Sequence, residues 1–398
     1  MGESMWVGVD VGKAAHHCVV LDDEGTQLLS ARVRNTEAAL SGLLDAVSAR
    51  AAGRGTTWAV DIKTGPIELM LALLHARGDR VVYLPGRAFH YAAQAYPGER
   101  KTDARDAAVI ADQARMRRDL CQLNPIPESI AALKTLLAYR AAISQDRVRA
   151  INRLRAHLSA VSPELEGAFD YAHNRGAVVL VSHFPSAAAI THVRDDEMLD
   201  ALAADGVRNP HTLVETARVL AGRQAVSLPG HDVTEALIRR QAHAVLALHV
   251  EVRQLDKDVT VHFRRHSYAP ILESMPGFGP HLGAEFLVGI AGSIDNYSNA
   301  DSLAGACGLI PIPRDSGNVV GRHRRPRRYD RRLLRACYRS AESAARHDDH
   351  ARTFYQRKRQ EGKVHQQAVI ALARRRIPVI WAMLRDRTEY GRLPTRRA

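Results

Sequence analysis

Two stretches of more than thirty residues, each with apolar side chains spaced three and four apart, constrain what this chain can fold into. They run from Ile130 to about Val161 and from about Val233 to His266, and charged residues occupy many of the other positions. This pattern predicts two long amphipathic helices. Neither carries enough apolar surface to form a domain alone, so we expect a coiled-coil arm or a pair of partner helices. The segment between them, about Glu164 to Gly230, is helical in composition and contains no motif.

The first part of the chain, to about residue 120, alternates strand and helix signals. The apolar run WVGVDV is followed by two β-like runs around the turn DDEG, which predicts a strand and a hairpin. TEAALSGLLDAVSAR and PIELMLALLHARG have helical spacing, whereas TTWAVDI and RVVYLPG are typical of further strands. A hairpin followed by strand–helix–strand alternation predicts a mixed sheet flanked by helices.

The last third of the chain opens with SMPGFGPHLGAEFLVGI. Its turn, Pro276 to Gly279 between two helical stretches, has the form of a helix-hairpin-helix, whose backbone N–H groups can meet a phosphate. We therefore expect an α/β domain over residues 1–122, a helical arm region over 123–268 and a mostly helical domain over 269–398.

The positive charge of the chain is concentrated near its C-terminal end. The net charge is +13, yet from Arg314 onward there are 24 Lys and Arg residues against 8 Asp and Glu. Within Arg322–Arg339 nine arginines accompany a single acid, Asp330. A solvated surface would normally mix the two signs, so this cluster predicts contact with nucleic acid through its phosphates.

Two further patterns bound the cellular setting and the kind of site. The chain has no run of 18 apolar residues, and its N-terminus lacks the basic-then-apolar pattern of a signal peptide, so we expect a cytoplasmic protein. The four cysteines are far apart and contain no CxxC pair, which argues against a zinc site and against a disulfide framework.

Four aspartates stand at the ends of predicted elements in the first domain. Asp10 ends the first strand and Asp61 a later one, whereas Asp103 and Asp106 lie three apart near the start of a helix. Any one of them could simply be a cap. Together they form a cluster of like charges that a divalent cation would hold, and Mg²⁺ or Mn²⁺ prefers such oxygen ligands. Two such ions about 4 Å apart can clamp both the attacking and the leaving oxygen of a phosphodiester.

This layout of hairpin, strand-end acid, second acid and paired acids on a helix is similar to the RNase H/RuvC-like nuclease fold. The phrases GVDVGK, VDIKTGP and ERKTDARDA resemble the DEDD-type insertion-sequence transposases and the related Piv-like DNA invertases, a family of bridge-RNA-guided recombinases. MPGFGPHLGAEFLVGIAGSIDNYSNADSLAGACGLIPIPRDSG resembles the C-terminal transposase domain of that family. The resemblance implies a DNA recombinase of a mobile insertion element, guided by a structured RNA.

The resemblance also implies roles for individual residues. The acidic tetrad of the family falls on Asp10, Asp61, Asp103 and Asp106, which would be catalytic ligands of Mg²⁺ or Mn²⁺. The family usually has Glu at the second position, and Asp61 is one methylene shorter. The family's nucleophilic serine falls on Ser316 in PIPRDSGNVVG, which by itself would suggest only a Ser-Gly turn. A phosphoserine link to DNA is implied, in a composite site where the metal-bearing domain of one subunit meets the serine-bearing domain of another.

The partners implied are double-stranded donor and target DNA, a structured non-coding RNA and further copies of the chain. The copies would form a dimer through the long helices, or a tetramer in the synaptic complex, in the nucleoid and away from membranes. The residues expected to contact nucleic acid are the lysine before the paired acids, the glycines of the turn and the arginines of the basic cluster: Lys101, Gly277, Gly279, Arg314, Arg322, Arg324, Arg325, Arg327, Arg328, Arg331 and Arg332.

Three other functions fit parts of the sequence. A metal-dependent nuclease or junction resolvase would use the same acids to activate water and would not need Ser316. GVDVGK also resembles the first phosphate turn of sugar kinases and actin-like ATPases, although the second glycine-rich loop of that fold is missing. A non-catalytic nucleic-acid-binding protein, with Asp61 marking a decayed acidic site, is the third.

Overall fold

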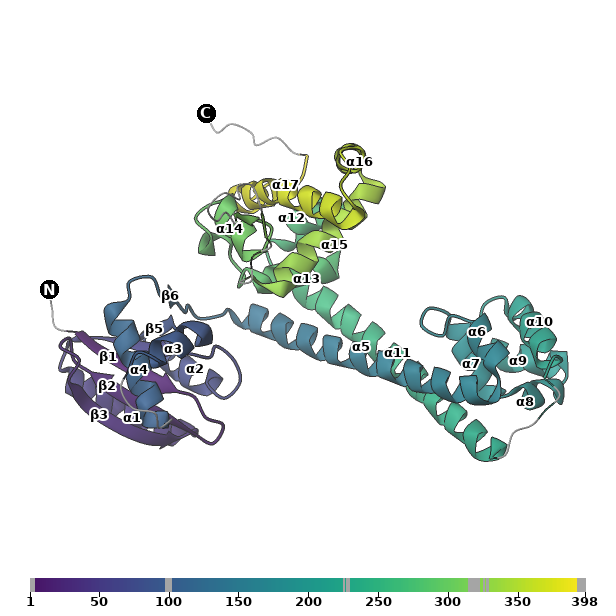
Figure 1. Ribbon diagram of the computed structural model, residues 1–398, viewed down its shortest axis with the longest axis horizontal. Helices are drawn as coiled ribbons and strands as arrows, with labels where there is room; N and C mark the ends of the chain where they lie inside the picture. The colour runs from purple at the N-terminus through teal and green to yellow at the C-terminus, as the bar shows by residue number, and fades with distance from the viewer. Residues whose placement is uncertain are drawn as a thin grey trace. The chain divides into compact units, whose positions relative to one another are not determined.

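A computed structural model of the chain describes residues 4–96, 102–224, 226, 230–313, 323–324, 326 and 329–391 (Figure 1). The chain divides into two compact units, Met1–Ile126 and Pro127–Ala398. The first unit is α/β and the second is almost entirely helical. None of the helices within the described ranges has the length and hydropathy that a membrane span requires.

The first unit is built on one mixed sheet of six strands in the order β3-β2-β1-β4-β5-β6. β1 pairs antiparallel with β2, and β2 with β3, which is the predicted hairpin around Asp22 to Thr26. β1 pairs parallel with β4, and β4 with β5, as the strand–helix–strand alternation predicts. The strands are β1 (Ser4–Asp10), β2 (Ala15–Leu21), β3 (Gln27–Arg34), β4 (Gly55–Val60), β5 (Arg80–Tyr83) and β6 (Cys121–Gln122). The mixed sheet expected from the sequence is confirmed.

Side chains alternate between the two faces of this sheet, and different helices cover each face. Met5, Val7 and Val9 of β1 belong to one buried cluster together with apolar residues of α1 (Glu37–Ala51) and α2 (Glu68–Ala76). The opposite face packs against α4 (Asp103–Met116), whose Ala107 and Ala111 lie in a cluster with residues of β2. α3 (Gly86–Ala93) packs against α4. The two faces of the sheet at β1 are therefore covered by different helices, α1 and α2 on one side and α4 on the other.

Gly8 allows α4 to rest directly on the sheet. A Cβ atom at Gly8 would lie 2.1 Å from the carbonyl oxygen of Ala107 and 2.3 Å from the backbone nitrogen of Ala111. Real side chains do not come that close to backbone atoms, so only glycine permits this approach. Ala59, the residue of β4 that pairs with Gly8, is also small and packs with the α4 residues Ile110 and Ala114.

The second unit contains both long helices that the sequence predicts. α5 (Glu128–Val161) and α11 (His231–Arg264) pack along one another, and the two predictions are confirmed within two residues at each end. Side-chain hydrogen bonds also join the two helices. Arg140 Nε donates to Asp256 Oδ1 at 2.9 Å, and the Tyr139 hydroxyl donates to Glu251 at 2.8 Å.

Two buried clusters lie along this helix pair. One includes Leu154, Leu158, Ile238 and Val245 and is completed by five shorter helices, which form the segment where the sequence showed no motif. These are α6 (Pro163–Ala168), α7 (Arg175–His183), α8 (Ala187–Thr191), α9 (Asp195–Ala204) and α10 (Pro210–Ala221). The other includes Ile130, Leu133, Val259 and Phe263. It is completed by α12 (Ala269–Ser274), α13 (Pro280–Gly289), α14 (Ala300–Ala306), α15 (Arg331–His347), α16 (Asp349–Gln360) and α17 (His365–Asp386).

The turn Pro276 to Gly279 lies between α12 and α13, as expected, and it packs into the core of its unit. Gly277 has a φ of +85°, and a Cβ atom there would lie 2.2 Å from the carbonyl oxygen of Ser340 on α15. Arg376 of α17 donates hydrogen bonds to the carbonyl oxygen of Pro276 and to Ser340 Oγ. Packing against α15 is thus enough to require glycine at position 277, and the phosphate contact expected there stays a prediction.

The fold brings together two of the widely spaced cysteines. Cys307 and Cys337 are buried free thiols whose sulfur atoms lie 3.8 Å apart. In the first unit, burial raises the pKa of the Cys18 thiol on β2 to about 12, and the charge of Asp10 makes a smaller contribution. Cys18 is also buried, whereas Cys121 is exposed.

Candidate active site

The sheet brings Asp10 and Asp61 to the same edge and the same face. β1 and β4 are parallel and paired up to Val9 and Val60, so each aspartate is the next residue at the carboxyl end of its strand. Gly8 and Ala59, two residues earlier on the two strands, face α4. Because side chains repeat with a period of two along a strand, Asp10 and Asp61 point toward the α4 side.

The first turn of α4 supplies the other two carboxylates. Thr102 caps the helix, its Oγ1 accepting a hydrogen bond from the backbone N–H of Arg105 at 3.3 Å. Asp103 opens the helix and is exposed, whereas Asp106 is 5% exposed and faces inward beside Ala107. Since Ala107 touches Gly8, the start of α4 lies above the end of β1, where Asp10 stands.

Asp61 carries the clearest electrostatic signal of the four. Burial raises the pKa of the Asp61 carboxyl above its ordinary value, and the negative charge of Asp106 raises it further. Its Oδ1 atom is buried and has no hydrogen-bond partner among the described residues. A partly buried carboxylate with one unpartnered oxygen, close to the charge of a second carboxylate, is an unfavourable arrangement unless a positive charge stands between them.

Two of the four carboxylates, those of Asp61 and Asp106, could contribute oxygen ligands to a divalent cation. The Asp61 and Asp106 carboxylates interact, the Asp61 oxygen needs a partner, and carboxylate oxygens are the ligands that Mg²⁺ prefers. Asp10 stands at the neighbouring strand end, and Asp103 is exposed on the same helical turn. Within the described ranges, no three His, Cys, Asp or Glu side chains converge closely enough to ligate one ion.

An Asp61→Asn variant tests this description without an activity assay. The raised pKa of Asp61 means that its carboxyl favours the fold only while protonated, and that this stabilisation is lost as the pH rises through the folded-state pKa. At neutral pH and without divalent cations, the variant should therefore unfold at a higher temperature than the wild type. Its free energy of unfolding should be larger by about 1 kcal/mol. Added Mg²⁺ should stabilise the wild type and not the variant, measured by thermal unfolding.

An exposed aspartate provides the matched control for that measurement. Asp119→Asn removes the same charge at a site whose carboxylate pairs with Arg117, and its response to Mg²⁺ should equal that of the wild type. A cation site at Asp61 is contradicted if Mg²⁺ leaves the unfolding temperature of the wild type unchanged, or raises that of Asp61→Asn by the same amount.

Three residues near the acids were not singled out from the sequence. Arg105 donates from Nη2 to the carbonyl oxygens of Ala93 and Tyr96, each at 3.0 Å, and so ties the end of α3 to the first turn of α4. Lys63 places its Nζ 4.2 Å from the centroid of the Tyr83 ring. Burial raises the pKa of Tyr83, as does the nearby charge of Asp61. No spacing rule in the sequence links Lys63 to Tyr83, because they come together only through the pairing of β4 with β5.

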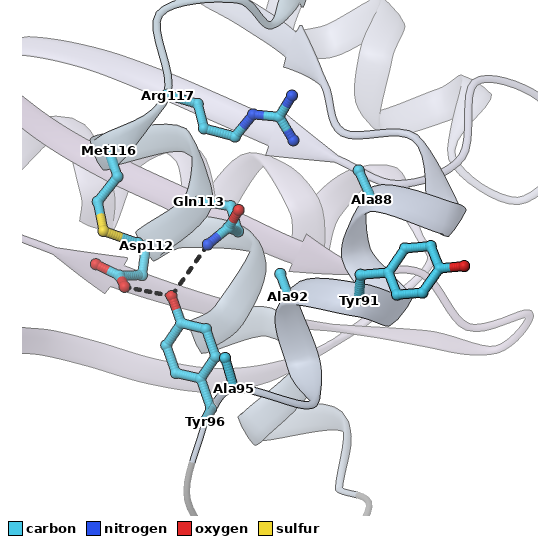
Figure 2. A pocket seen from close by; sticks show the side chains of 9 residues that line it. All are labelled: Ala88, Tyr91, Ala92, Ala95, Tyr96, Asp112, Gln113, Met116 and Arg117. Atoms are coloured by element: carbon cyan, nitrogen blue, oxygen red, sulfur yellow. Dashed lines mark hydrogen bonds between the residues drawn. The ribbon is translucent and has the colours of Figure 1, made fainter. Parts of the chain in front are cut away.

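A separate hollow of about 540 Å³ lies between α3 and the second half of α4 (Figure 2). In it the Tyr96 hydroxyl donates to Asp112 and accepts from Gln113 Nε2 at 3.3 Å. None of the four predicted aspartates lines this hollow. With the Arg105 bonds, these contacts hold α4 against the end of α3 and Tyr96.

The remaining predicted site residues fall mostly outside the described residues. Arg331 and Arg332 lie in the first turn of α15, which Asp330 caps by accepting from the backbone N–H of Arg332 at 2.7 Å. Gly279 precedes α13 as its N-cap. Arg324 lies in β8 (His323–Arg324), which pairs with β7 (Ile312–Pro313). Outside the described residues lie Lys101, Arg314, Ser316, Arg322, Arg325, Arg327 and Arg328.

Two family models match the two ends of the chain. A model of DEDD-type IS110 proteins, described as "Transposase", matches residues 7–163 and so spans all four aspartates. A second, described as "Transposase IS116/IS110/IS902 family", matches residues 269–356.

Several curated proteins match nearly the whole chain. The 42 kDa protein of insertion element IS900 from Mycobacterium paratuberculosis is 46% identical over 98% of both chains. The 44.8 kDa protein of insertion element IS116 from Streptomyces clavuligerus is 43% identical, over 98% of this chain and 97% of its own. The 43.6 kDa protein of insertion element IS110 from Streptomyces coelicolor is 34% identical, over 98% of this chain and 96% of its own. At these identities, and with the acidic segment and the C-terminal domain both matched, the chain belongs to the IS116/IS110/IS902 family of insertion-element transposases.

Proposed function

We propose that this transposase cuts and rejoins DNA through a phosphoserine intermediate on Ser316, assisted by Mg²⁺ or Mn²⁺ on the four aspartates and guided by a structured bridge RNA. The observation that carries the proposal is the meeting of two strand ends and one helix start in the first unit. There the partly buried Asp61 carboxylate interacts with the buried Asp106 carboxylate, and Asp10 stands at the adjacent strand end.

The chain's own residues would prepare this site in three ways. The backbone contact between Gly8 and α4 fixes the height of Asp106 above the strand ends. Arg105 and the Thr102 cap hold the first turn of α4, and with it the orientation of Asp103 and Asp106. When bound, the cation would supply charge stabilisation for the phosphodiester oxygens. Since all four ligands are oxygens, Mg²⁺ and Mn²⁺ suit the site better than zinc.

The proposed chemistry is two transfers of one phosphoryl group. In the first, Ser316 Oγ loses its proton to a base and attacks phosphorus, while the bond from phosphorus to the leaving deoxyribose oxygen breaks and that oxygen takes a proton. In the second, a hydroxyl of another DNA strand attacks the phosphoserine, and Ser316 recovers its proton. The bond energy is conserved, so no nucleotide cofactor is needed. This role of Ser316 rests on the family's serine, and the acids and the serine would come from different subunits.

RNA guidance rests on the family resemblance and agrees with the concentration of positive charge. The 24 basic residues from Arg314 onward, against 8 acidic ones, can neutralise phosphates of RNA as well as of DNA. In a guided recombinase the protein contacts backbone and shape, while base pairing selects the sequence. The shortage of aromatic residues, 5% of the chain, fits contacts with backbone better than stacking on unpaired bases.

The proposal is tested by reconstituting recombination with the purified protein and the RNA that co-purifies with it. Joining of element and target DNA should require both the RNA and a divalent cation. Ribonuclease treatment or a chelator should each lower product by at least about tenfold, and adding back RNA or Mg²⁺ should restore it. Undiminished joining after complete RNA removal would eliminate the guided part, and undiminished joining in chelator would eliminate the metal part.

A further inference from the structure

A cavity of about 720 Å³ opens on the surface of the second unit. Its lining residues are far in the sequence from the four aspartates. It forms where α11 passes the start of α7 and the link between α9 and α10. Four of its lining residues are cations, namely Arg175 on α7, Arg208 in the link, and Arg253 and Lys257 on α11. We call this surface the arm groove.

Helical spacing places the α11 cations in one row. His249, Arg253 and Lys257 follow one another at intervals of four residues and so lie on one side of α11. The like charges of Arg253 and Lys257 repel at this spacing, which disfavours the helix slightly unless an anion lies between them. Arg175 and Arg208 approach the same row from the small helices across the groove.

The carboxylates of this region do not neutralise the row. Asp205 is the acid that lines the groove, and its carboxylate is bonded to His183 Nε2 at 2.6 Å. Arg175 Nη1 donates instead to the backbone carbonyl oxygen of Asp205, at 2.8 Å. Among the described residues, none of the four groove cations forms an ion pair with a carboxylate. Their charges therefore remain available to an external anion.

His249 at the floor of the groove reports the local positive potential. Burial lowers the pKa of its imidazole, and the charges of Arg147, Arg253 and Arg175 lower it further, although these arginines come from three different helices. Arg147 Nη1 lies 3.2 Å from His249 Nδ1, and Arg147 Nε is buried without a hydrogen-bond partner in the described part of the chain. Three guanidinium groups thus converge on one neutral ring.

We propose that the arm groove binds the sugar–phosphate backbone of duplex DNA. The guanidinium group of arginine can donate two parallel hydrogen bonds to phosphate oxygens. Val250, which is exposed in the lining of the groove, offers an apolar side chain against which a deoxyribose can pack. Apart from His249, no lining residue carries a ring, so the groove offers no platform for stacking splayed bases. The inference rests on the proposed function in one respect, that the ligand of a transposase is DNA.

The test uses the full-length protein and its affinity for duplex DNA. In Arg253→Gln/Lys257→Gln, affinity for a duplex of about 30 base pairs should fall about tenfold at roughly 150 mM salt. The slope of log affinity against log salt should become shallower by about 1.8, since each lost phosphate contact contributes about 0.9. The matched control, Arg240→Gln/Arg265→Gln, removes two exposed positive charges, one on α11 and one at its C-cap, and should leave the slope unchanged.

Three further measurements keep the result unambiguous. Thermal unfolding should be unchanged in both double variants, because all four residues are exposed. Binding is measured in chelator. In a protein that also carries Asp103→Asn, the two groove substitutions should lower affinity for duplex DNA as they do in the wild type. Failure of the metal chemistry and failure of this inference therefore give different results. Equal salt slopes for the groove and control variants would overturn the inference. A loss confined to a structured RNA hairpin, with duplex DNA bound as before, would also overturn it.

Discussion

A Ser316→Ala variant is expected to lose covalent capture of DNA completely. The proposed intermediate joins phosphorus to Ser316 Oγ, and alanine has no atom that can form that bond. Wild-type protein incubated with element DNA, RNA and Mg²⁺ and then denatured should carry a DNA adduct that is visible as a slower band on a denaturing gel. Digestion and mass spectrometry should place the nucleotide on the peptide that contains Ser316.

The control for this variant is Ser298→Ala. Ser298 is exposed in the same unit, and its loss should leave the adduct at the wild-type level. A metal-dependent nuclease would behave differently, because water would release free DNA ends and no adduct would form in any variant. Adduct formation that persists in Ser316→Ala would remove the serine from the mechanism.

Asp106→Asn should lower recombination by about 10³-fold while leaving DNA binding intact. Asp106 is the buried member of the helical pair and the one whose charge acts on Asp61. The amide keeps the size of the side chain and removes the charge that a cation needs, so the fold should persist. Recombination is measured by quantifying joined product over time with the co-purified RNA and Mg²⁺.

Two comparisons separate this expectation from others. Asp119→Asn removes a carboxylate from the same unit at an exposed position and should recombine as the wild type does. If an Asp103→Ala/Asp106→Ala variant also retained recombination, the acids would have no catalytic role, and the non-catalytic binding alternative would replace the metal mechanism.

The sequence predicts elements well wherever a single period governs them. Short apolar runs bounded by turn residues predicted the strands and the hairpin of the first unit, and three/four spacing predicted α5 and α11 to within two residues at each end. The strand-end position of Asp10 and Asp61 also follows from the sequence, because parallel strands end at one edge. That both point toward α4 does not follow, since it depends on which face the helix covers.

Features that depend on tertiary contact were not predicted. Gly277 has the turn-like sequence context of a phosphate loop, but the fold explains it by the approach of α15 to its Cα. The arm groove is another case, because Arg175, Arg208 and Arg253 are far apart in the sequence and line one groove only where α7 and the α9–α10 link meet α11. Arg105 is a third case: it lies between the two helical aspartates, and its role depends on the end of α3.

The contact of Gly8 with α4 has a consequence for the position of the helical carboxylates. It sets the separation between the sheet and the helix at its minimum, because no side chain stands between Gly8 and the backbone of Ala107 and Ala111. Any side chain added at position 8 would push α4 outward, and Asp106, which adjoins Ala107, would move away from the strand ends where Asp10 and Asp61 stand. The distance between the carboxylates of the strands and those of the helix is therefore controlled by a residue that carries no functional group.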